Sequence, residues 1–433
     1  MVLKRIQLGL IHVAVAMTLV PINSTLNRVM IKELALSATL VAVLASLPYL
    51  LSPIQVMIGA FSDRHPLLGL RRTPYIAAGL LLCVIGLVLS PQAAFLIATN
   101  FWAGIGLGLL AFGAWGMGFN FATVSYLSLA SELSGERSRG RTVAIMWFMM
   151  ICSIIVTAIV LSHMVDPFSA QALVRSFWIV GLAALVLGLI GLIRLEPRAM
   201  SAPASDQGEY SWGRLFSFIL ENRQATLFFI YLAVLLAAIL GQDILLEPFG
   251  GEAFGMPVQA TTRITSIWGG CVLVALLVAG GLDGRVNKRT LASLGAWSAL
   301  AGFVLITISG LALSQGIFYG GVVFLGVGTG LATVSNLSLM LDMTTTEKVG
   351  LFIGAWGMSN AVSRLVGTIL GGAVRDVVAQ VAHNPVTGYA VVFGIEAIML
   401  LVSLYLLQKI DVGAFRRQAE QPSLLEQASL AAD

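Results

Sequence analysis

The sequence contains an internal repeat at a spacing of 210 residues, close to half of its 433-residue length. The segment Ala-Thr-Val-Ser-Tyr-Leu-Ser-Leu at 122–129 returns as Ala-Thr-Val-Ser-Asn-Leu-Ser-Leu at 332–339, with seven of eight residues identical. The flanking matches, without a gap, are Gly116 with Gly326, Gly118 with Gly328 and Glu132 with Asp342. A direct repeat of this length predicts two copies of one structural unit that run in the same direction.

Composition places these two units in a membrane. The chain is 58% hydrophobic and only 11% charged, and its mean hydropathy is +0.92, whereas average soluble domains carry roughly 25% charged residues. Its apolar runs are about 20 residues long, which predicts spanning helices and not the short alternating strands of a barrel. The three cysteines, which lie in apolar stretches, are expected to be core residues and not disulfide or metal ligands.

The apolar runs predict about twelve transmembrane helices in an all-α integral membrane fold. The expected spans are 6–30, 35–61, 73–90, 101–131, 141–164, 172–193, 225–246, 262–282, 289–311, 316–341, 349–376 and 387–408. A polar stretch at 196–224 separates the sixth span from the seventh. We therefore expect a six-helix bundle at 1–195, a cytoplasmic linker at 196–224, a second six-helix bundle at 225–410 and a cytoplasmic tail at 411–433.

The distribution of basic residues predicts the orientation. If both termini are cytoplasmic, 19 of the 25 lysines and arginines lie in inner segments. This bias is the positive-inside pattern of membrane proteins, so the net charge of +4 indicates topology and not a nucleic-acid partner. The expected location is a membrane, with both termini in the cytoplasm and the lipid bilayer as the surrounding partner.

Two loops on the expected inner side carry the same arrangement of an acid and basic residues. The candidate residues are Asp63, Arg64, Arg71 and Arg72 in the first half and Asp283 and Arg285 in the second. An acid at a helix end beside a basic cluster can form a conformational latch that closes in one state only. The loops resemble the G-x-x-x-D-[RK]-x-G-[RK]-[RK] motif of the major facilitator superfamily, although Arg71 follows Asp63 by eight residues instead of four. The alternative is simple positive-inside anchoring.

The expected outer end of the first span is unusually polar. Asn23, Thr25, Asn27 and Arg28 lie there, and Asn23 and Asn27 share a helix face because they are four residues apart. Polar groups at membrane depth usually face a cavity or another helix. These residues are therefore candidates for substrate binding, or they mark the exit of the chain into water.

The seventh span, which begins the second half, ends in a similar way. Gln242, Asp243 and Glu247 precede a Pro-Phe-Gly-Gly break, and the two acids are four residues apart. Such a pair could bind a cation, a proton or a basic segment of a partner. The alternative is a solvated outer loop.

Two further residues within spans are candidates for a site. Arg364 in the eleventh span needs an acidic partner or a polar ligand group, and Glu396 in the twelfth span is a candidate partner for an ion pair. His12 in the first span could supply an imidazole to the magnesium of a chlorophyll, or it could simply be hydrogen-bonded within the bundle. No P-loop, nucleotide fingerprint or His/Glu zinc spacing occurs. We expect neither an enzyme, nor a protein-bound metal centre, nor a covalent cofactor.

Three segments give the chain a resemblance to a known family. Residues 24–34 (Ser-Thr-Leu-Asn-Arg-Val-Met-Ile-Lys-Glu-Leu), 71–74 (Arg-Arg-Thr-Pro) and 243–251 (Asp-Ile-Leu-Leu-Glu-Pro-Phe-Gly-Gly) are similar to the PucC/LhaA family. This family is the bacteriochlorophyll-delivery branch of the major facilitator superfamily. The resemblance runs from about residue 4 to 410. It implies the assembly of light-harvesting complexes in a cell inner membrane or a photosynthetic membrane, with antenna polypeptides and pigment-synthesis enzymes as partners. It also implies bound chlorophyll or bacteriochlorophyll, for which the polar residues of the first and seventh spans and Arg364 are the binding candidates.

Two function classes follow. An assembly factor that binds a tetrapyrrole or an antenna helix needs a wide apolar cleft; candidate walls are the fourth-span aromatic residues Trp102, Phe112, Trp115, Phe119, Phe121 and Tyr126. An ion-coupled transporter of a small amphipathic solute instead needs a titratable group inside the membrane, for which Asp243, Glu247 and Glu396 are the candidates. The low charge of the spans favours an apolar cargo.

Overall fold

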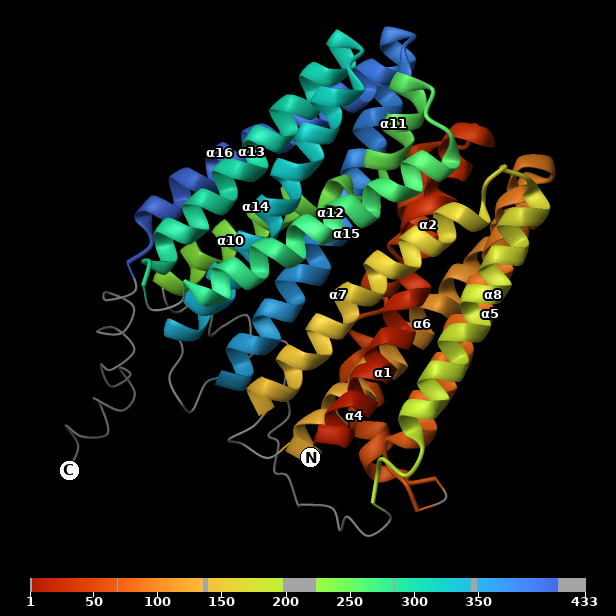
Figure 1. Cartoon of the computed structure of the whole chain (residues 1–433), viewed down its shortest axis with the longest axis vertical. Coiled ribbons are helices and arrows are strands. Elements are labelled where there is room, and N and C mark those ends of the chain that lie inside the picture. The colour runs from red at the N-terminus through yellow and green to blue at the C-terminus, as the bar shows by residue number, and fades with distance from the viewer. Residues whose placement is uncertain are drawn as a thin grey trace, which may run out of the picture.

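The computed structural model describes residues 2–67, 69–134, 139–197, 223–282, 285–343 and 349–411, and within these ranges the regular elements are helices (Figure 1). The first half contains α1 (Val2–Val20), the π-helical turns η1 (Pro21–Leu26) and η2 (Val29–Glu33), α2 (Ala38–Ala45), α3 (Leu47–Leu50), α4 (Ile54–Arg64), α5 (Thr73–Thr99), α6 (Phe101–Ser134), α7 (Arg139–Met164) and α8 (Ala170–Leu192). The second half contains α10 (Arg223–Gly241), the 3-10 turn η4 (Gln242–Ile244), α11 (Leu246–Phe254), α12 (Val258–Gly281), α13 (Lys288–Ala312), α14 (Gln315–Asp342), α15 (Val349–Ala382) and α16 (Pro385–Lys409).

These helices confirm the prediction of about twelve spans. Within the described ranges, 11 helices are long and apolar enough to cross a membrane. A twelfth crossing is built from the three short helices α2, α3 and α4, which together occupy the predicted span at 35–61. It is broken because Pro48 and Pro53 cannot donate backbone hydrogen bonds. At this break, Asn120 Nδ2 of α6 donates a hydrogen bond to the Pro48 carbonyl at 3.0 Å.

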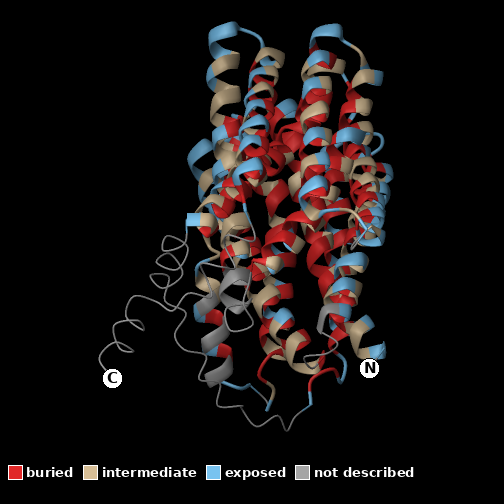
Figure 2. Ribbon diagram, turned by 90° about the vertical axis from the view of Figure 1, so that its left-hand side faces the viewer, coloured by how far each residue is buried: buried red, intermediate tan, exposed pale blue. Residues whose placement is uncertain are grey.

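The two halves lie side by side and meet along two pairs of helices. The first half occupies the red-to-yellow side of the bundle and the second half the green-to-blue side (Figure 1). α7 packs along α12, and α2 packs along α15. Buried residues follow the inside of both halves, and many residues of the outer helix faces are exposed (Figure 2), as expected for helices that face lipid.

The sequence repeat corresponds to a repeated helix contact. In the first half, a Cβ added at Gly79 would lie 2.5 Å from the Ala122 nitrogen, and in the second half a Cβ at Gly295 would lie 2.7 Å from the Ala332 nitrogen. Ala122 and Ala332 are the first residues of the two repeated segments. Glycine is therefore required at the same place in both halves, because the helix backbones touch there.

The third span is longer than the sequence predicted. We expected it to end at residue 90, before Pro91, but α5 continues through Pro91 to Thr99. Proline removes the hydrogen bond that would reach the Leu87 carbonyl. Ser90 Oγ donates to that carbonyl at 2.7 Å, so the freed acceptor is satisfied inside the helix.

The first span of each half departs from α-helical geometry toward the same end of the bundle. The first continues from α1 through the π turns η1 and η2 to Glu33, beyond the predicted end at residue 30. The seventh breaks after Gly241 into η4 and then α11, beyond the predicted end at residue 246. π turns are rare and frequently occur at functional sites. The residues in these two breaks face each other, because η1 contacts η4 and η2 contacts α11.

Candidate functional site

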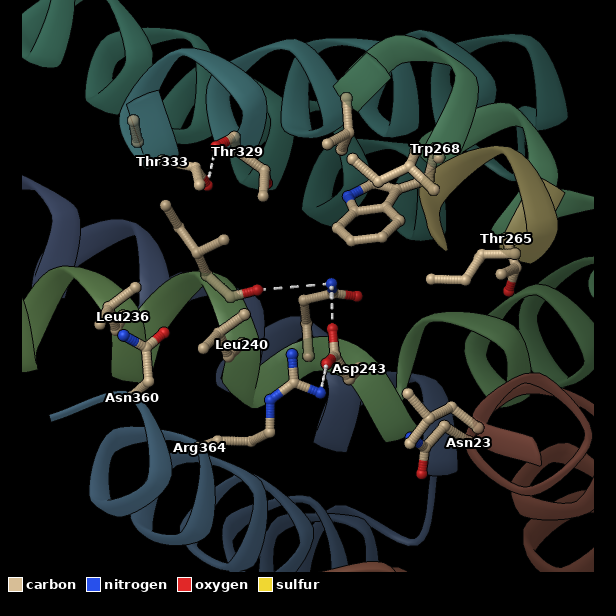
Figure 3. A pocket seen from close by; sticks show the side chains of 18 of the residues that line it. Asn23, Leu236, Leu240, Asp243, Thr265, Trp268, Thr329, Thr333, Asn360 and Arg364 are labelled. Atoms are coloured by element: carbon tan, nitrogen blue, oxygen red, sulfur yellow. Dashed lines mark hydrogen bonds and ion pairs between the residues drawn. The ribbon is translucent and has the colours of Figure 1, made fainter. Parts of the chain in front are cut away.

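A central cavity of about 450 Å³ lies between the two halves, and helices of both halves line it. This volume falls in the usual range for small-molecule sites. Most of the wall is apolar, with side chains such as Leu235, Leu236 and Ile154. The charged and amide side chains on the wall are Asn23, Gln242, Asp243, Glu247, Asn336, Asn360 and Arg364. Figure 3 shows Asp243 and Arg364 pointing toward each other beneath Trp268.

An ion pair between Asp243 and Arg364 forms the centre of the polar part of the wall. Arg364 Nη1 lies 2.7 Å from Asp243 Oδ2 and donates to the Tyr49 hydroxyl at 3.1 Å. The guanidinium carbon also lies 5.2 Å from the centre of the Tyr49 ring. The pair joins α15 to the break after α10, while Tyr49 comes from the first half. The prediction that Arg364 needs an acidic partner is confirmed, but the partner is Asp243 and not Glu396.

Two glycines explain why this pair forms. A Cβ added at Gly367 would lie 2.5 Å from the Ala237 carbonyl oxygen, and one at Gly241 would lie 3.2 Å from the Gly367 carbonyl oxygen. α10 and α15 therefore pack backbone against backbone at the point where α10 ends. Arg364 is three residues before Gly367, so it lies about one helical turn away, beside Asp243 in the broken segment.

Glu247 lies on the same wall and is 4% exposed. Thr265 Oγ1 donates a hydrogen bond to Glu247 Oε1. The Ser24 hydroxyl lies beside the same carboxyl group, although no close hydrogen bond reaches Glu247 Oε2. Gln242 is 2% exposed, and its Oε1 atom also has no partner. Of the two acids of the seventh span, Glu247 is buried and Asp243 is half-buried, and both lie on the cavity wall. The alternative of a solvated outer loop is therefore wrong.

The polar residues of the first span have separate roles. Asn23 lines the cavity. Thr25 Oγ1 lies 3.1 Å from Thr262 Oγ1 of the second half, and Asn27 Nδ2 donates to the Asn23 carbonyl at 3.1 Å. Arg28 is 2% exposed, and it binds Glu33 at 2.8 Å and the Met256 carbonyl at 3.1 Å. Of these four candidates only Asn23 reaches the cavity wall, while Thr25 and Arg28 connect the two halves.

His12 and most of the fourth-span aromatic residues lie away from the cavity wall. His12 is 7% exposed, and its ring centre is 6.3 Å from that of Trp147, which does line the cavity. Among the aromatic side chains of α6, Phe119 lines the cavity. Trp115 is fully buried between helices, whereas Trp102 is 81% exposed. Ordinary packing and contact with lipid explain the latter two.

The predicted inner latch is only partly visible. The side chains of Asp63 and Arg64 and all of Asp283 lie outside the described residues, and Arg285 is exposed. Arg72 lies 3.1 Å from Glu132, and Lys288 lies 2.8 Å from Asp342. These acids are the pair that the repeat matches, so the two halves share an ion pair here. A switch that opens and closes stays a prediction.

The Arg71–Arg72 segment also serves a structural purpose. The backbone N–H groups of Arg71, Arg72 and Thr73 donate to the Glu196 carboxylate at 2.7–3.1 Å. Glu196 thus caps the first turn of α5, where three N–H groups would otherwise lack partners. The sequence analysis placed Glu196 at the start of the linker, whereas the structure ties it to the first bundle. The rest of the predicted linker, 198–222, and the tail from 412 on lie outside the described residues.

A second polar cluster, which the sequence analysis missed, joins the halves at the end that carries η2, α2 and α11. We call Glu252, Arg375, Asp376 and the first turn of α2 the closing cluster. Asp376 of α15 accepts hydrogen bonds from the Ala38 nitrogen at 3.0 Å and from the Thr39 nitrogen at 2.8 Å. Arg375 binds Asp376 at 3.0 Å and Glu252 at 2.8 Å. The only signal in the sequence was the presence of charged residues in apolar spans.

Comparison with known proteins gives a family and a fold. The family model described as "PUCC protein" matches residues 25–415. Protein PucC of Cereibacter sphaeroides is 30% identical over 414 residues, which cover 93% of this chain and 90% of that protein. Protein PucC of Rhodobacter capsulatus is 31% identical over 420 residues, covering 93% and 90%. The "Bacteriochlorophyll synthase 44.5 kDa chain" of Rhodobacter capsulatus is 26% identical over 433 residues, covering 98% of each chain.

Solved transporter structures share the fold. The nucleoside transporter NupG superposes with a TM-score of 0.71 at 15% identity, covering 94% of this chain and 98% of that one. A bacterial homologue of the human lysosomal transporter Spinster, in an inward-facing and unoccupied conformation, gives a TM-score of 0.73 at 13% identity, covering 97% and 98%. At these identities the likeness concerns the fold alone. It confirms the predicted major facilitator-like architecture.

Proposed function

This chain belongs to the PucC family, and on that premise we propose that it is an assembly factor for light-harvesting complexes. It delivers bacteriochlorophyll or chlorophyll to antenna polypeptides, or it chaperones those polypeptides in the membrane. The observation that carries this proposal is the family match over 25–415. The name of one full-length relative, which refers to bacteriochlorophyll synthase, supports a role close to pigment.

The central cavity supports a large amphipathic cargo. Its wall is mostly apolar, and its charged groups gather around the Asp243–Arg364 pair. A tetrapyrrole has a broad apolar ring with a few polar substituents, so both parts of such a molecule find a matching surface. We propose that the protein holds this cargo without catalysing a reaction, and without a covalent cofactor or a nucleic-acid partner.

The proposed setting follows from the same premise. We place the protein in a cell inner membrane or a photosynthetic membrane with both termini in the cytoplasm, so that the closing cluster faces outward. The proposed partners are antenna polypeptides and, on the cytoplasmic side, pigment-synthesis enzymes.

The test is to purify the full chain in mild detergent from a pigment-making phototroph and to record its absorption spectrum. We expect a chlorophyll-type band in stoichiometric amount. The substitution Thr333→Trp on the cavity wall should remove most of the band, because the indole would fill part of the cavity. The matched control is Leu337→Trp on the same helix, where the side chain is 40% exposed.

The possible outcomes distinguish pigment delivery from a polypeptide chaperone and from the absence of an assembly role. Pigment lost in Thr333→Trp and kept in Leu337→Trp would support delivery through the cavity. A colourless protein that co-purifies with antenna polypeptide would support the polypeptide chaperone. A colourless protein with neither partner would contradict an assembly role.

One observation favours a second candidate function. Asp243 and Arg364 pair inside a cavity between two halves of a transporter fold, and Glu396 lies nearby, since a Cβ at Gly241 would lie 2.9 Å from Glu396 Oε1. A buried acid of this kind could carry a proton, so the alternative is an ion-coupled transporter of a small amphipathic solute. Loss of proton-coupled uptake in Asp243→Asn would support it, whereas intact uptake with lost antenna assembly would contradict it.

A further inference from the structure

The hydrogen bonds between the two halves gather at one end of the bundle. This end carries η2, α2 and α11 (Figure 1), and we call it the closed end. Among the described residues, every hydrogen bond from one half to the other lies here, except the bond between Arg364 and Tyr49 on the cavity wall. The partners at the closed end are Thr25 with Thr262, Arg28 with Met256, Ala38 and Thr39 with Asp376, and Ser162 and His163 with Arg263.

Asp376 of the closing cluster makes three of these bonds. Its carboxylate accepts from the Ala38 nitrogen at 3.0 Å, from the Thr39 nitrogen at 2.8 Å and from the Thr39 hydroxyl at 2.7 Å. A residue of the second half thus pairs with two N–H groups in the first turn of α2, which would otherwise lack partners inside the helix. Hydrogen bonds to an ionised group are roughly twice as strong as those between neutral groups. A separation of the halves at this end would break all three at once.

Arg28 joins the same end from the opposite direction. It belongs to the first half, is 2% exposed and donates to the Met256 carbonyl of the second half at 3.1 Å. A Cβ added at Gly251 would lie 2.5 Å from Arg28 Nε, so the guanidinium lies directly against the backbone of α11. Gly372 of α15 approaches α2 in a similar way, because a Cβ there would lie 2.8 Å from the Ala38 carbonyl oxygen. The halves are thus in contact at this end through backbone atoms and a buried charge.

The cavity extends away from the closed end. Ser162 and His163, which lie in the last turn of α7, belong to the closed end, whereas Trp147 lies in the first part of that helix. Trp147 lines the cavity and is 46% exposed. Trp356, in the first part of α15, also lines it. Elements that move during function are drawn from the parts of a protein with few buried contacts, and the closed end has the opposite character.

Resting on the proposed function, we infer that the closed end stays closed throughout the working cycle, and that the protein takes up and releases its cargo at the opposite end only. It is a one-sided carrier, which receives the cargo and passes it to an antenna polypeptide without moving it across the membrane. The second candidate function, an ion-coupled transporter, would instead require both ends to open in turn.

A disulfide across the closed end tests this inference. The hydroxyl oxygens of Thr25 and Thr262 are 3.1 Å apart, so the sulfur atoms of the double variant Thr25→Cys, Thr262→Cys can come within bonding distance. Diamide, a thiol oxidant, takes up the two protons and two electrons that the thiols lose, and dithiothreitol reverses the bond. The natural cysteines Cys83, Cys152 and Cys271 are replaced by alanine in every variant. The chain is expressed in a phototroph that lacks its own copy, and newly formed antenna complex is followed by absorption.

The rate of antenna assembly gives the result. With about nine-tenths of the protein cross-linked, we expect the same rate as in the reduced sample, whereas a carrier that must open both ends would lose about tenfold. A tenfold loss that dithiothreitol restores would overturn the inference and leave the proposed function intact. No assembly with the unmodified chain would overturn the proposed function, and the one-sided route with it. The single variant Thr25→Cys, treated in the same way, is the control for the oxidant.

A distance measurement covers the case in which the double variant does not fold. Spin labels are placed at Lys32→Cys of the first half and at Leu311→Cys of the second, both of which are exposed at the closed end. The distance between the labels is recorded in the purified full chain with and without bacteriochlorophyll a. We expect a single distance distribution that is the same in both samples. A second component at longer distance in either sample would overturn the inference.

Discussion

The closing cluster and the polar part of the cavity wall are both built from acids and an arginine, but their hydrogen bonds differ. In the closing cluster each oxygen of the Glu252 and Asp376 carboxylates has at least one donor. On the cavity wall Gln242 Oε1 and Glu247 Oε2 have none. The Arg375 Nε atom has no partner, but the paired carboxylates of the closing cluster stabilise one arrangement of the helices, whereas the unpaired oxygens of Gln242 and Glu247 add no such contact. We therefore expect the carboxylates of the closing cluster to contribute more to stability than the carboxyl group of Glu247.

Removing Asp376 from the closing cluster should have the largest effect on the free energy of unfolding. Asp376→Ala removes the acceptor for the Ala38 and Thr39 N–H groups of α2 and leaves Arg375 with one carboxylate instead of two. We expect the free energy of unfolding in mixed micelles to fall by about 3 kcal/mol. A fall below about 1 kcal/mol would mean that the cluster does not hold the halves together.

A glycine at the same interface gives a second test. A Cβ at Gly372 of α15 would lie 2.8 Å from the Ala38 carbonyl oxygen, so Gly372→Ala should force α15 away from α2 and cost about 2 kcal/mol. The matched control is Gly357→Ala on the same helix, where a Cβ meets nothing within 4 Å. This change should stabilise the helix by about 0.5–1 kcal/mol. Equal effects in both variants would show that the close approach does not matter.

Releasing the arginine on the cavity wall should change ligand preference. Asp243→Asn leaves Arg364 without its paired carboxylate. We expect the affinity for bacteriochlorophyllide a to rise by about tenfold, because its carboxylate can then bind the free guanidinium. The affinity for the esterified pigment, bacteriochlorophyll a, should change little. In Asp243→Asn combined with Arg364→Gln the gain should disappear, and a gain that persists would contradict the charge argument.

The sequence predicted the number and approximate bounds of the spans well, because the hydrophobic pattern is itself the cause of membrane insertion. It also predicted the repeat, and the structure adds that the first repeated residues, Ala122 and Ala332, meet Gly79 and Gly295 in the two halves. It failed where a local hydrogen bond decides the outcome. Ser90 allows α5 to pass Pro91, and no periodicity carries that information.

The candidate site could be predicted only in part. Gln242, Asp243, Glu247 and Arg364 were recognised, since charges within apolar spans are rare. Their pairing was not predictable, because Asp243 meets Arg364 through the contact of Gly241 with Gly367 between distant helices. For the same reason the sequence left Thr25 and Arg28 as candidates for binding or for the exit into water, whereas they connect the halves.

The smallest expected effect gives the sharpest test of the comparison. Glu247→Gln keeps the oxygen that Thr265 binds and changes only the atom that has no partner. The ligand-free protein should therefore differ from the original by no more than about 0.5 kcal/mol in the free energy of unfolding. The same acid-to-amide change at the closing cluster, Asp376→Asn, should cost clearly more, because both oxygens of Asp376 accept hydrogen bonds from α2 or Arg375. If the two amide variants lost equal stability, then the unpaired oxygen of Glu247 would have a hidden structural partner, and the division between a structural cluster and a binding wall would fail.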